Sequence, residues 1–236
     1  YSLFVTTSQD IHLPNGDIYI KKHMDGVIFA GEVDIRVIEE FRKQSIPVVL
    51  VNNYLDMDGL VCISADHYGG AVQATEYLCK LGHCKIGLLS GRFSPQVSEA
   101  RIEGFVKTLA KYDIPVDDRF IADIEPALED GEEIMTRMLR GVDRPTAFFC
   151  TNDTIAAGAM KAVTRAGLRV PEDIAIIGFD DSYISRVVEP ELTTVRIDAA
   201  KMGCLAMQTL FDLIAGMPVE KAHIQIPTEL IVRGTA

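Results

Sequence analysis

The feature that most constrains this chain is a regular alternation of short apolar runs with longer amphipathic stretches. The short runs carry almost no polar alternation, which is typical of strands buried on both faces of a parallel sheet. The longer stretches repeat apolar residues every three or four positions, which is the spacing of one helix face. An alternation of this kind along the whole chain predicts βαβ units, parallel sheets and an α/β protein.

The apolar runs predict strands at Ser2–Thr6, Gly26–Ala30, Pro47–Val51, Val61–Ser64, Lys85–Ser90, Thr146–Cys150, Ala175–Gly178 and Thr194–Ile197. The amphipathic stretches predict helices at Val33–Gln44, Tyr68–Leu81, Val97–Lys111, Gly131–Arg140, Thr154–Ala166 and Ala199–Ala215. Gly82 and Gly167 stand where helix ends favour a left-handed residue, and Pro171 follows the second of them. No long linker separates two halves, so any two lobes are expected to be joined by short crossovers.

Charge and composition exclude several classes of protein. The chain of 236 residues is long enough for one large domain or two small ones, and it contains no apolar run long enough to cross a membrane. Its formal net charge of −11 repels phosphate, so these residues are not expected to bind nucleic acid broadly by themselves. The five cysteines are scattered without a Cys-x-x-Cys pair, and the N-terminus shows no secretory leader, which favours reduced thiols and a cytoplasmic location.

Metal and catalytic sites are both disfavoured by the residue spacing. Cys79, His83 and Cys84 could act as metal ligands, but a fourth ligand at finger-like spacing is missing, and a helix ending at Gly82 accounts for the same segment. The segment GLLSGR lacks the ending of a phosphate loop and the spacing of a nucleophile elbow. No nucleophile, base and oxyanion group can be assembled, so we expect no enzyme activity, no metal and no cofactor.

Polar side chains follow the predicted strands, at the edge where open parallel sheets bind their ligands. They are Asn52, Asn53, Asp66, Arg92, Asn152, Asp153, Asp180 and Asp181. Amides, carboxylates and guanidinium groups suit a polyhydroxylated ligand, because carboxylates accept hydrogen bonds and amides both donate and accept them. Arg101, early in a predicted helix, could add a charged donor to the same site.

Several of these residues also have a structural interpretation. Adjacent residues in a strand or turn point apart, so Asp180 and Asp181 are poorly placed as a catalytic pair. We expect Asp180 to bind the ligand and Asp181 to be a turn or cap residue. Arg101 could instead form a salt bridge to a nearby acid. Asn152 could cap the following helix or contact the ligand, and Asp153 is favoured as the cap.

Five segments of the chain, taken in order, resemble the LacI/GalR family of transcription regulators. They are ADHYGGAVQATEYLCKLGHCKIGLLSG, SEARIEGF, PTAFFCTNDTIAAGAMKAVTRAGLRVPEDIAIIGFDD, PELTTVRIDAAKMGCLAMQTLFDLIAG and PTELIVRGTA. The similarity extends from about Met24 to the C-terminus. It implies two doubly wound parallel-sheet lobes of the periplasmic-binding-protein-like type. The N-terminal lobe would comprise residues 1–64 plus 195–224, and the C-terminal lobe residues 65–194 plus 225–236.

The resemblance also implies which residues bind the ligand. Family members hold effector hydroxyls with residues that match three positions here, and a fourth position lies where some relatives use an Asp. The four predicted polar ligand residues are, in that order, Arg101, Asn152, Asp180 and Asn52. The aromatic residue that packs on the ligand in relatives falls near Pro126, so another ring would have to replace it. The candidates for that ring are Phe93, Phe179 and Tyr183.

The family pattern is incomplete at the N-terminus of this sequence. The helix-turn-helix with its hinge is absent, and the first strand and helix of the first lobe are missing. We therefore expect a first lobe truncated at its N-terminus, and a native protein that continues upstream into a basic DNA-binding segment.

The function implied by the resemblance is effector sensing. A small polar ligand, expected to be a sugar or a sugar derivative, would bind between the two lobes and allosterically alter operator binding by the upstream helix-turn-helix. A homodimer is expected, with the helix Ala199–Ala215 near the contact surface. The alternative is a periplasmic sugar-binding protein of a transporter. An upstream signal peptide would favour this alternative, and an upstream helix-turn-helix would favour the regulator.

Overall fold

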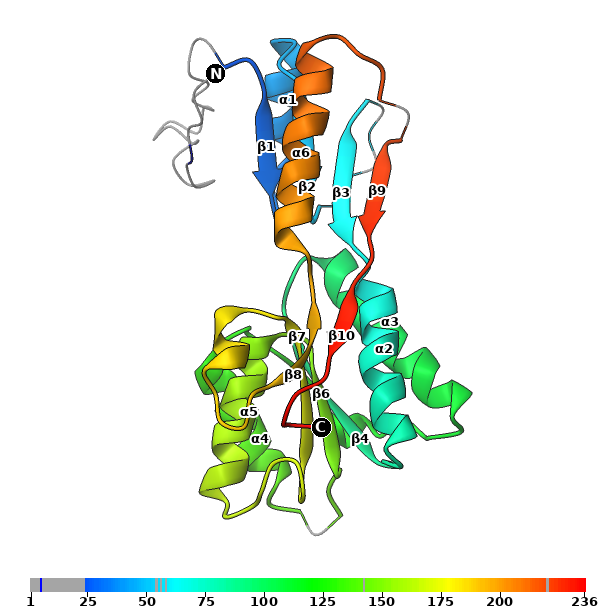
Figure 1. The fold of residues 1–236 in the computed structure, drawn as a ribbon, viewed down its shortest axis with the longest axis vertical. Coiled ribbons are helices and arrows are strands. Elements are labelled where there is room, and N and C mark those ends of the chain that lie inside the picture. Colours follow the sequence, from blue (N-terminus) through cyan, green and yellow to red (C-terminus); the bar gives the residue numbers. More distant parts are fainter. Residues whose placement is uncertain are drawn as a thin grey trace. The chain divides into compact units, whose positions relative to one another are not determined.

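The computed structural model of the chain describes Val5 and residues 24–53, 55, 57, 59–141, 143–219 and 221–236. These residues form two compact units (Figure 1). The first comprises the described residues up to Ala65 together with Ala199–Ile226, and the second comprises Asp66–Asp198 together with Pro227–Ala236. The chain thus passes from one unit to the other three times, through short connections. Apart from Val5, the predicted strand Ser2–Thr6 lies outside the described residues.

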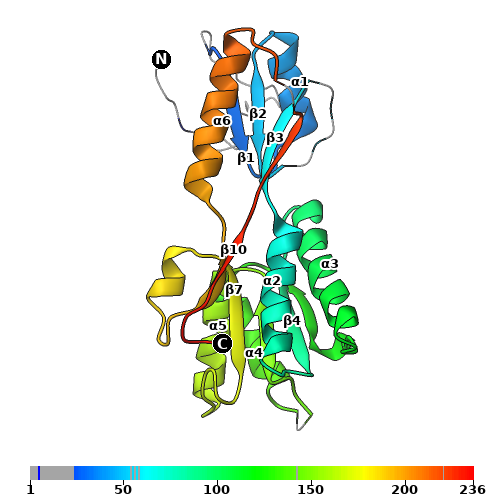
Figure 2. The ribbon, with the colours of Figure 1, turned by 45° about the vertical axis from the view of Figure 1, so that its right-hand side comes forward.

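The first unit is a parallel sheet covered by two helices. Its strands, in spatial order, are β1 (Val27–Ala30), β2 (Val48–Val51), β3 (Val61–Ala65) and β9 (His223–Ile226). The helices α1 (Ile35–Lys43) and α6 (Ala199–Ile214) lie on opposite faces of this sheet (Figures 1 and 2). Asp34 begins α1 by accepting a hydrogen bond from the backbone N–H of Arg36, and the apolar face of α1 packs Ile38 and Phe41 into the core.

The second unit is a doubly wound sheet. Its strands, in spatial order, are β10 (Glu229–Ile231), β8 (Thr193–Arg196), β7 (Ala175–Asp180), β6 (Ala147–Cys150), β4 (Ile86–Gly91) and β5 (Ile121–Ile124). All pairs are parallel except β10 with β8.

Four helices cover this sheet. The pair α2 (His67–Lys80) and α3 (Pro95–Lys111) covers one face, and the pair α4 (Leu128–Met138) and α5 (Asp153–Arg165) covers the other (Figures 1 and 2). Each face has its own apolar core, one built around Phe105 and Phe149 and the other around Met135 and Phe148. Two short 3-10 helices, η2 (Asp118–Phe120) and η3 (Tyr183–Arg186), lie in the connections.

The predicted alternation of strands and helices is confirmed over the described residues, with shifts of a few residues at element ends. Gly82 and Gly167 have φ of +90° and +74°, so both are the left-handed residues that the helix ends require. Three strands, β5, β9 and β10, were not predicted from apolar runs, although β10 lies in the segment PTELIVRGTA that resembles the family. The strand β5 is only four residues long and contains the polar Asp123, and β9 alternates polar with apolar residues, so neither shows the continuous apolar run of a buried strand.

The described residues contain no group of three or more His, Cys, Asp or Glu side chains arranged to hold a metal ion. In the segment weighed as a metal site, Cys79 is buried near the end of α2, and His83 Nδ1 lies 2.8 Å from the Thr146 hydroxyl. Within the same part of the chain, no helix combines the length and apolar character that membrane crossing requires.

Candidate functional site

The strand order of the second unit marks one place at its edge. The chain runs outward from β4 to β5 and then returns to place β6 on the other side of β4. At such a switch point the loops leaving two neighbouring strands diverge, and open α/β sheets bind ligands in the crevice between them. The loops in question begin at Arg92, after β4, and at Thr151, after β6. They are joined at their base, because Thr151 Oγ1 accepts a hydrogen bond of 2.7 Å from the N–H of Gly91.

Arg101 is the central side chain at this place. It extends from α3, is only 3% exposed, and donates from Nη1 to the carbonyl oxygen of Thr151. Its Nη2 lies 3.3 Å from Asp180 Oδ1 at the end of β7, and its Nε donates to His67 Nδ1 over 3.4 Å. One guanidinium group therefore ties together α2, α3 and the ends of β6 and β7.

Two aromatic rings lie against this guanidinium. Its central carbon is 3.9 Å from the ring centroid of Phe179 and 4.9 Å from that of Phe93. Phe179 is fully buried, so it packs beneath Arg101 and offers no face to a ligand. Phe93 is half-buried, and its ring folds back against Gly91, where a Cβ would come within 2.8 Å of it. Of these two rings, Phe93 is therefore the one that lies against Arg101 and keeps part of its surface exposed.

Asp180 has an unusual backbone and an unusual acidity. Its φ of +110° is rare for a residue other than glycine, and such conformations cluster at functional sites. Burial raises the pKa of the Asp180 carboxyl to about 6, against the opposing influence of the nearby Arg101 guanidinium. The carboxylate is thus held near a single cation rather than fully neutralised by several.

The prediction that Asp153 caps the following helix is wrong. Asn152 is the cap, because it has extended dihedral angles and its Oδ1 accepts a 2.8 Å hydrogen bond from the N–H of Ile155. Asp153 is buried instead. Its carboxylate accepts from the N–H and the hydroxyl of Ser182, at 2.6 and 3.0 Å, and from the hydroxyl of Thr194. Burial raises the pKa of Asp153, although these hydrogen bonds oppose the rise. The strand β6 ends at Cys150 as predicted, but α5 begins at Asp153, one residue earlier than predicted, so the cap falls on Asn152.

Asp181 takes a turn conformation, with φ of +52°, but its carboxylate does more than the predicted turn or cap role requires. That side chain is 2% exposed and lies 2.5 Å from Arg233, 2.8 Å from Arg196 and 3.3 Å from Arg186. Burial acts to raise the pKa of Asp181, but the arginine hydrogen bonds outweigh burial and lower that pKa to about 2. The residue joins the end of β7 to η3, to β8 and to the C-terminal segment.

The remaining predicted residues lie away from the Arg101 cluster or in the other unit. Asn52, in the first unit, has φ of +51°, and its side chain accepts a 3.2 Å hydrogen bond from the N–H of Ala65. Tyr183 is 82% exposed at the start of η3. Arg92 forms ion pairs with Asp123 and Glu125 at the surface. The structure therefore brings together Arg101, Asp180, Phe93 and Phe179, with Asn152 next to Thr151.

His67 was missed by reasoning from the sequence. It is 2% exposed, its ring lies 6.0 Å from that of Phe179, and it touches Arg101 across 34 positions of the chain. Burial, helped by the charge of Arg101, lowers the pKa of the imidazole to about 3. The only local signal was its position directly after Asp66, the residue that caps α2.

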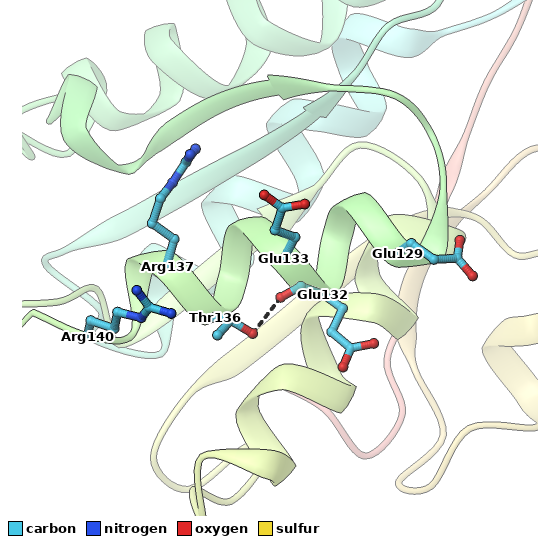
Figure 3. Close-up of a pocket in the computed structure, with 6 residues that line it drawn as sticks. All are labelled: Glu129, Glu132, Glu133, Thr136, Arg137 and Arg140. Carbon is cyan, nitrogen blue, oxygen red and sulfur yellow. Dashed lines mark hydrogen bonds between the residues drawn. The ribbon is translucent and has the colours of Figure 1, made fainter.

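A separate surface pocket lies along α4 (Figure 3). It is lined by Glu129, Glu132, Glu133, Thr136, Arg137 and Arg140. Glu132 already pairs with Lys161 and Arg165 of α5, and the Thr136 hydroxyl donates to the Glu132 carbonyl oxygen. These charges are arranged as on a solvated helix face, so the pocket is a weaker candidate than the switch point.

Comparison with known proteins identifies the family. Residues 75–236 match the model of a periplasmic binding protein-like domain. A probable HTH-type transcriptional repressor ExuR of Bacillus subtilis is 34% identical over 99% of this chain and 70% of its own length. This chain belongs to the LacI family of transcription regulators. It is the effector-binding domain of a LacI-family repressor, as the quoted segments predicted, and its relatives are repressors rather than enzymes.

Solved structures of the family agree with the fold. A regulatory protein of LacI family from Chloroflexus aggregans has a TM-score of 0.83 at 30% identity, over 89% of this chain and 76% of that one. A LacI family transcriptional regulator from Enterococcus faecium, solved with bound ribose, has a TM-score of 0.82 at 28% identity, over 89% and 79%. The predicted α/β fold of the periplasmic-binding-protein-like type, with two parallel sheets, is therefore confirmed.

Proposed function

We propose that the effector of this LacI-family domain is a sugar or a sugar derivative, and that it binds at the switch point of the second unit. The observation that carries the proposal is the buried Arg101, placed between Asp180 and the half-buried ring of Phe93. Adjacent hydroxyls can accept from a guanidinium and donate to a carboxylate, while the apolar face of a sugar ring packs on an aromatic ring. The ribose bound by the relative from Enterococcus faecium supports the same class of ligand.

Asn152 is a further member of the proposed polar set in the second unit, and Asn52 stays a prediction of the resemblance alone. Asn152 shares its side-chain oxygen with the cap of α5, so its amide N–H groups would serve the ligand. Asn52 belongs to the first unit, and its contribution comes from the resemblance to relatives that use an Asp at this position. Tyr183 and Phe179 are dropped from the set because one is 82% exposed and the other is fully buried.

We further propose that this domain regulates transcription in the cytoplasm. The net charge of −11 makes this domain a poor partner for DNA, so operator binding would come from a basic segment outside this domain. Effector binding would change operator affinity in a homodimer, with α6 near the contact surface. Phe211 on α6 and Met217 just beyond it are exposed apolar side chains that such a contact would cover.

The test is a thermal-stability screen with pentoses, hexoses and disaccharides, D-ribose included. A ligand at 100 times its Kd stabilises the folded state by about 2.7 kcal/mol, which is easily measured. Arg101→Ala should remove the response to the active sugar. Arg119→Ala is the matched control, since Arg119 lies in η2 before β5 and pairs with Asp117 and Asp143 at the surface, outside the switch point. A folded Arg101→Ala that responds as strongly as wild type would contradict the proposed site.

A further inference from the structure

We propose that His67 is a positioning residue for this site: its neutral imidazole accepts from Arg101 and fixes the orientation of the guanidinium that meets the effector. The effect of His67 on effector binding rests on the proposed function, whereas its contact with Arg101 is seen directly in the structure. His67 Nδ1 lies 3.4 Å from Arg101 Nε and 3.2 Å from Nη2. His67 is 2% exposed, so it acts through Arg101 rather than on the ligand.

The hydrogen-bond roles follow from the chemistry of the two groups. A guanidinium has only donors, so His67 Nδ1 must be the acceptor, and its proton must lie on Nε2. A doubly protonated imidazole would offer no acceptor and would add a second positive charge against Arg101. Burial and the Arg101 charge both disfavour that form, and they lower the pKa of His67 to about 3. The acceptor is therefore present throughout the neutral range of pH.

Orientation of the guanidinium needs an acceptor in its plane. The rings of Phe93 and Phe179, at 4.9 and 3.9 Å, hold the group within a layer but leave its rotation in that layer undetermined. The carbonyl oxygen of Thr151 fixes the Nη1 end, and His67 fixes the Nε edge. With both in place, Nη2 is directed to Asp180 Oδ1. Without His67, the Nε edge of the Arg101 guanidinium would lose its acceptor, and the group could rotate.

The local fold holds the imidazole where this contact requires it. His67 is the first residue of α2, and Asp66 caps that helix through a 2.8 Å hydrogen bond from the N–H of Gly69. The helix lies close to the core at Gly70, where a Cβ would come within 2.7 Å of the Phe179 ring. The imidazole lies 6.0 Å from the same ring, at an interplanar angle of 36°. The side chain is thus held by packing as well as by its helix.

The first test needs no ligand. Histidine labelled with ¹⁵N reports by NMR which ring nitrogen carries the proton, and His67→Asn assigns the His67 signals by their loss. Between pH 5 and 8 we expect His67 to keep Nε2 protonated and Nδ1 unprotonated, without titrating. A proton on Nδ1, or a titration within this range, would overturn the proposal.

The second test compares two substitutions. His67→Phe keeps a ring but removes the acceptor, whereas His67→Asn places an amide oxygen near the position of Nδ1. We expect the Nε–H proton of Arg101 to exchange slowly with water in wild type and in His67→Asn, and at least 10-fold faster in His67→Phe. His83→Phe is the control, because His83 contacts Thr146 outside the site. Equal protection in a folded His67→Phe would refute the positioning role.

The third test connects the contact to binding. For the sugar that gives the largest response in the screen, His67→Phe should raise Kd by about 10-fold or more, the effect of losing a hydrogen bond to a charged group, and His67→Asn should restore most of it. If Arg101→Ala removes the response but His67→Phe leaves Kd unchanged, the positioning role of His67 is refuted while the proposed site is not. A response that survives Arg101→Ala would refute the proposed site, while the proton-exchange result would still report on the contact.

Discussion

Two neighbouring carboxylates at the end of β7 differ in their arginine partners and have pKa values shifted in opposite directions. Asp181 is surrounded by the guanidinium groups of Arg186, Arg196 and Arg233, and its pKa is lowered to about 2. Asp180 faces the single guanidinium of Arg101, and burial raises its pKa to about 6. A carboxylate whose acceptor sites are filled by protein donors holds the fold together. A carboxylate that is incompletely compensated keeps capacity for a ligand.

The largest expected effect is on the Asp181 side of this comparison. Asp181→Ala should lower the free energy of unfolding by about 3 kcal/mol, because it leaves the largely buried Arg233 guanidinium without its closest carboxylate and removes the acceptor that Arg186 and Arg196 share with it. Urea denaturation measures the change. Asp173→Ala is the control, since Asp173 pairs with Arg169 at the surface, and its removal should cost less than about 1 kcal/mol. Equal effects of the two substitutions would mean that the buried Asp181 carboxylate is no more important to stability than a surface ion pair.

A different result is expected at Asp180. Asp180→Asn should raise Kd for the active sugar by about 10-fold or more, because an amide replaces a charged acceptor. Its effect on the free energy of unfolding should be much smaller than that of Asp181→Ala. Parallel calorimetric titrations and denaturation curves separate the two quantities. If Asp180→Asn lost stability but bound the sugar normally, Asp180 would have a structural role like that of Asp181 rather than a role in binding.

The contributions of Asp180 and Asp181 to stability should also differ in their pH dependence. The folded-state pKa of Asp180 is above that of an unfolded carboxyl, so its ionisation costs stability above about pH 6, and this cost is relieved as the pH falls from 7 towards 4. The folded-state pKa of Asp181 is lowered, so its contribution is present above about pH 4 and is lost as the pH falls towards 2. Between pH 7 and 5, wild type should gain stability relative to Asp180→Asn.

Wild type should show no such gain in stability relative to Asp181→Ala. The difference between wild type and Asp181→Ala should stay constant between pH 7 and 5, because Asp181 remains ionised over this range. Thermal unfolding of the three proteins in matched buffers provides the measurement. Parallel pH profiles for both variants would mean that the two carboxylates do not differ in the way described.

The smallest effect is expected at Tyr183, two residues beyond Asp181. Its side chain is 82% exposed, so Tyr183→Ala should change the free energy of unfolding by less than about 0.5 kcal/mol and leave sugar binding unaltered. Phe93→Ala is the informative partner, because Phe93 lies against Arg101 and its loss should weaken sugar binding. Weaker binding in Tyr183→Ala than in Phe93→Ala would exchange the roles of the two rings.

The fold could be predicted from the sequence because buried parallel strands are written as continuous apolar runs. The runs that became β2, β3, β4, β6 and β7 are of this kind. Such a run is missing at β5, a sheet-edge strand whose Asp123 forms a surface ion pair with Arg92. A strand that needs little burial leaves little apolar signal.

The site could be predicted only in part. Asp180 was predicted from its strand-end position, Arg101 from its place early in a helix, and both from the family resemblance; the structure brings them within 3.3 Å. The exchange of roles between Asn152 and Asp153 reflects a one-residue difference in where α5 begins, which tertiary packing around the buried Asp153 carboxylate decides. His67 could not be predicted, because its contact with Arg101 depends on how α2 packs against α3.

The central claim is that Arg101 and Asp180 form the polar part of the effector site. A crystal structure of the domain with the sugar selected by the stability screen tests it most directly. We expect electron density for the sugar in contact with Arg101 and Asp180, with its ring against Phe93. A sugar bound elsewhere on the domain, with the Arg101–Asp180 pair unaltered, would contradict it.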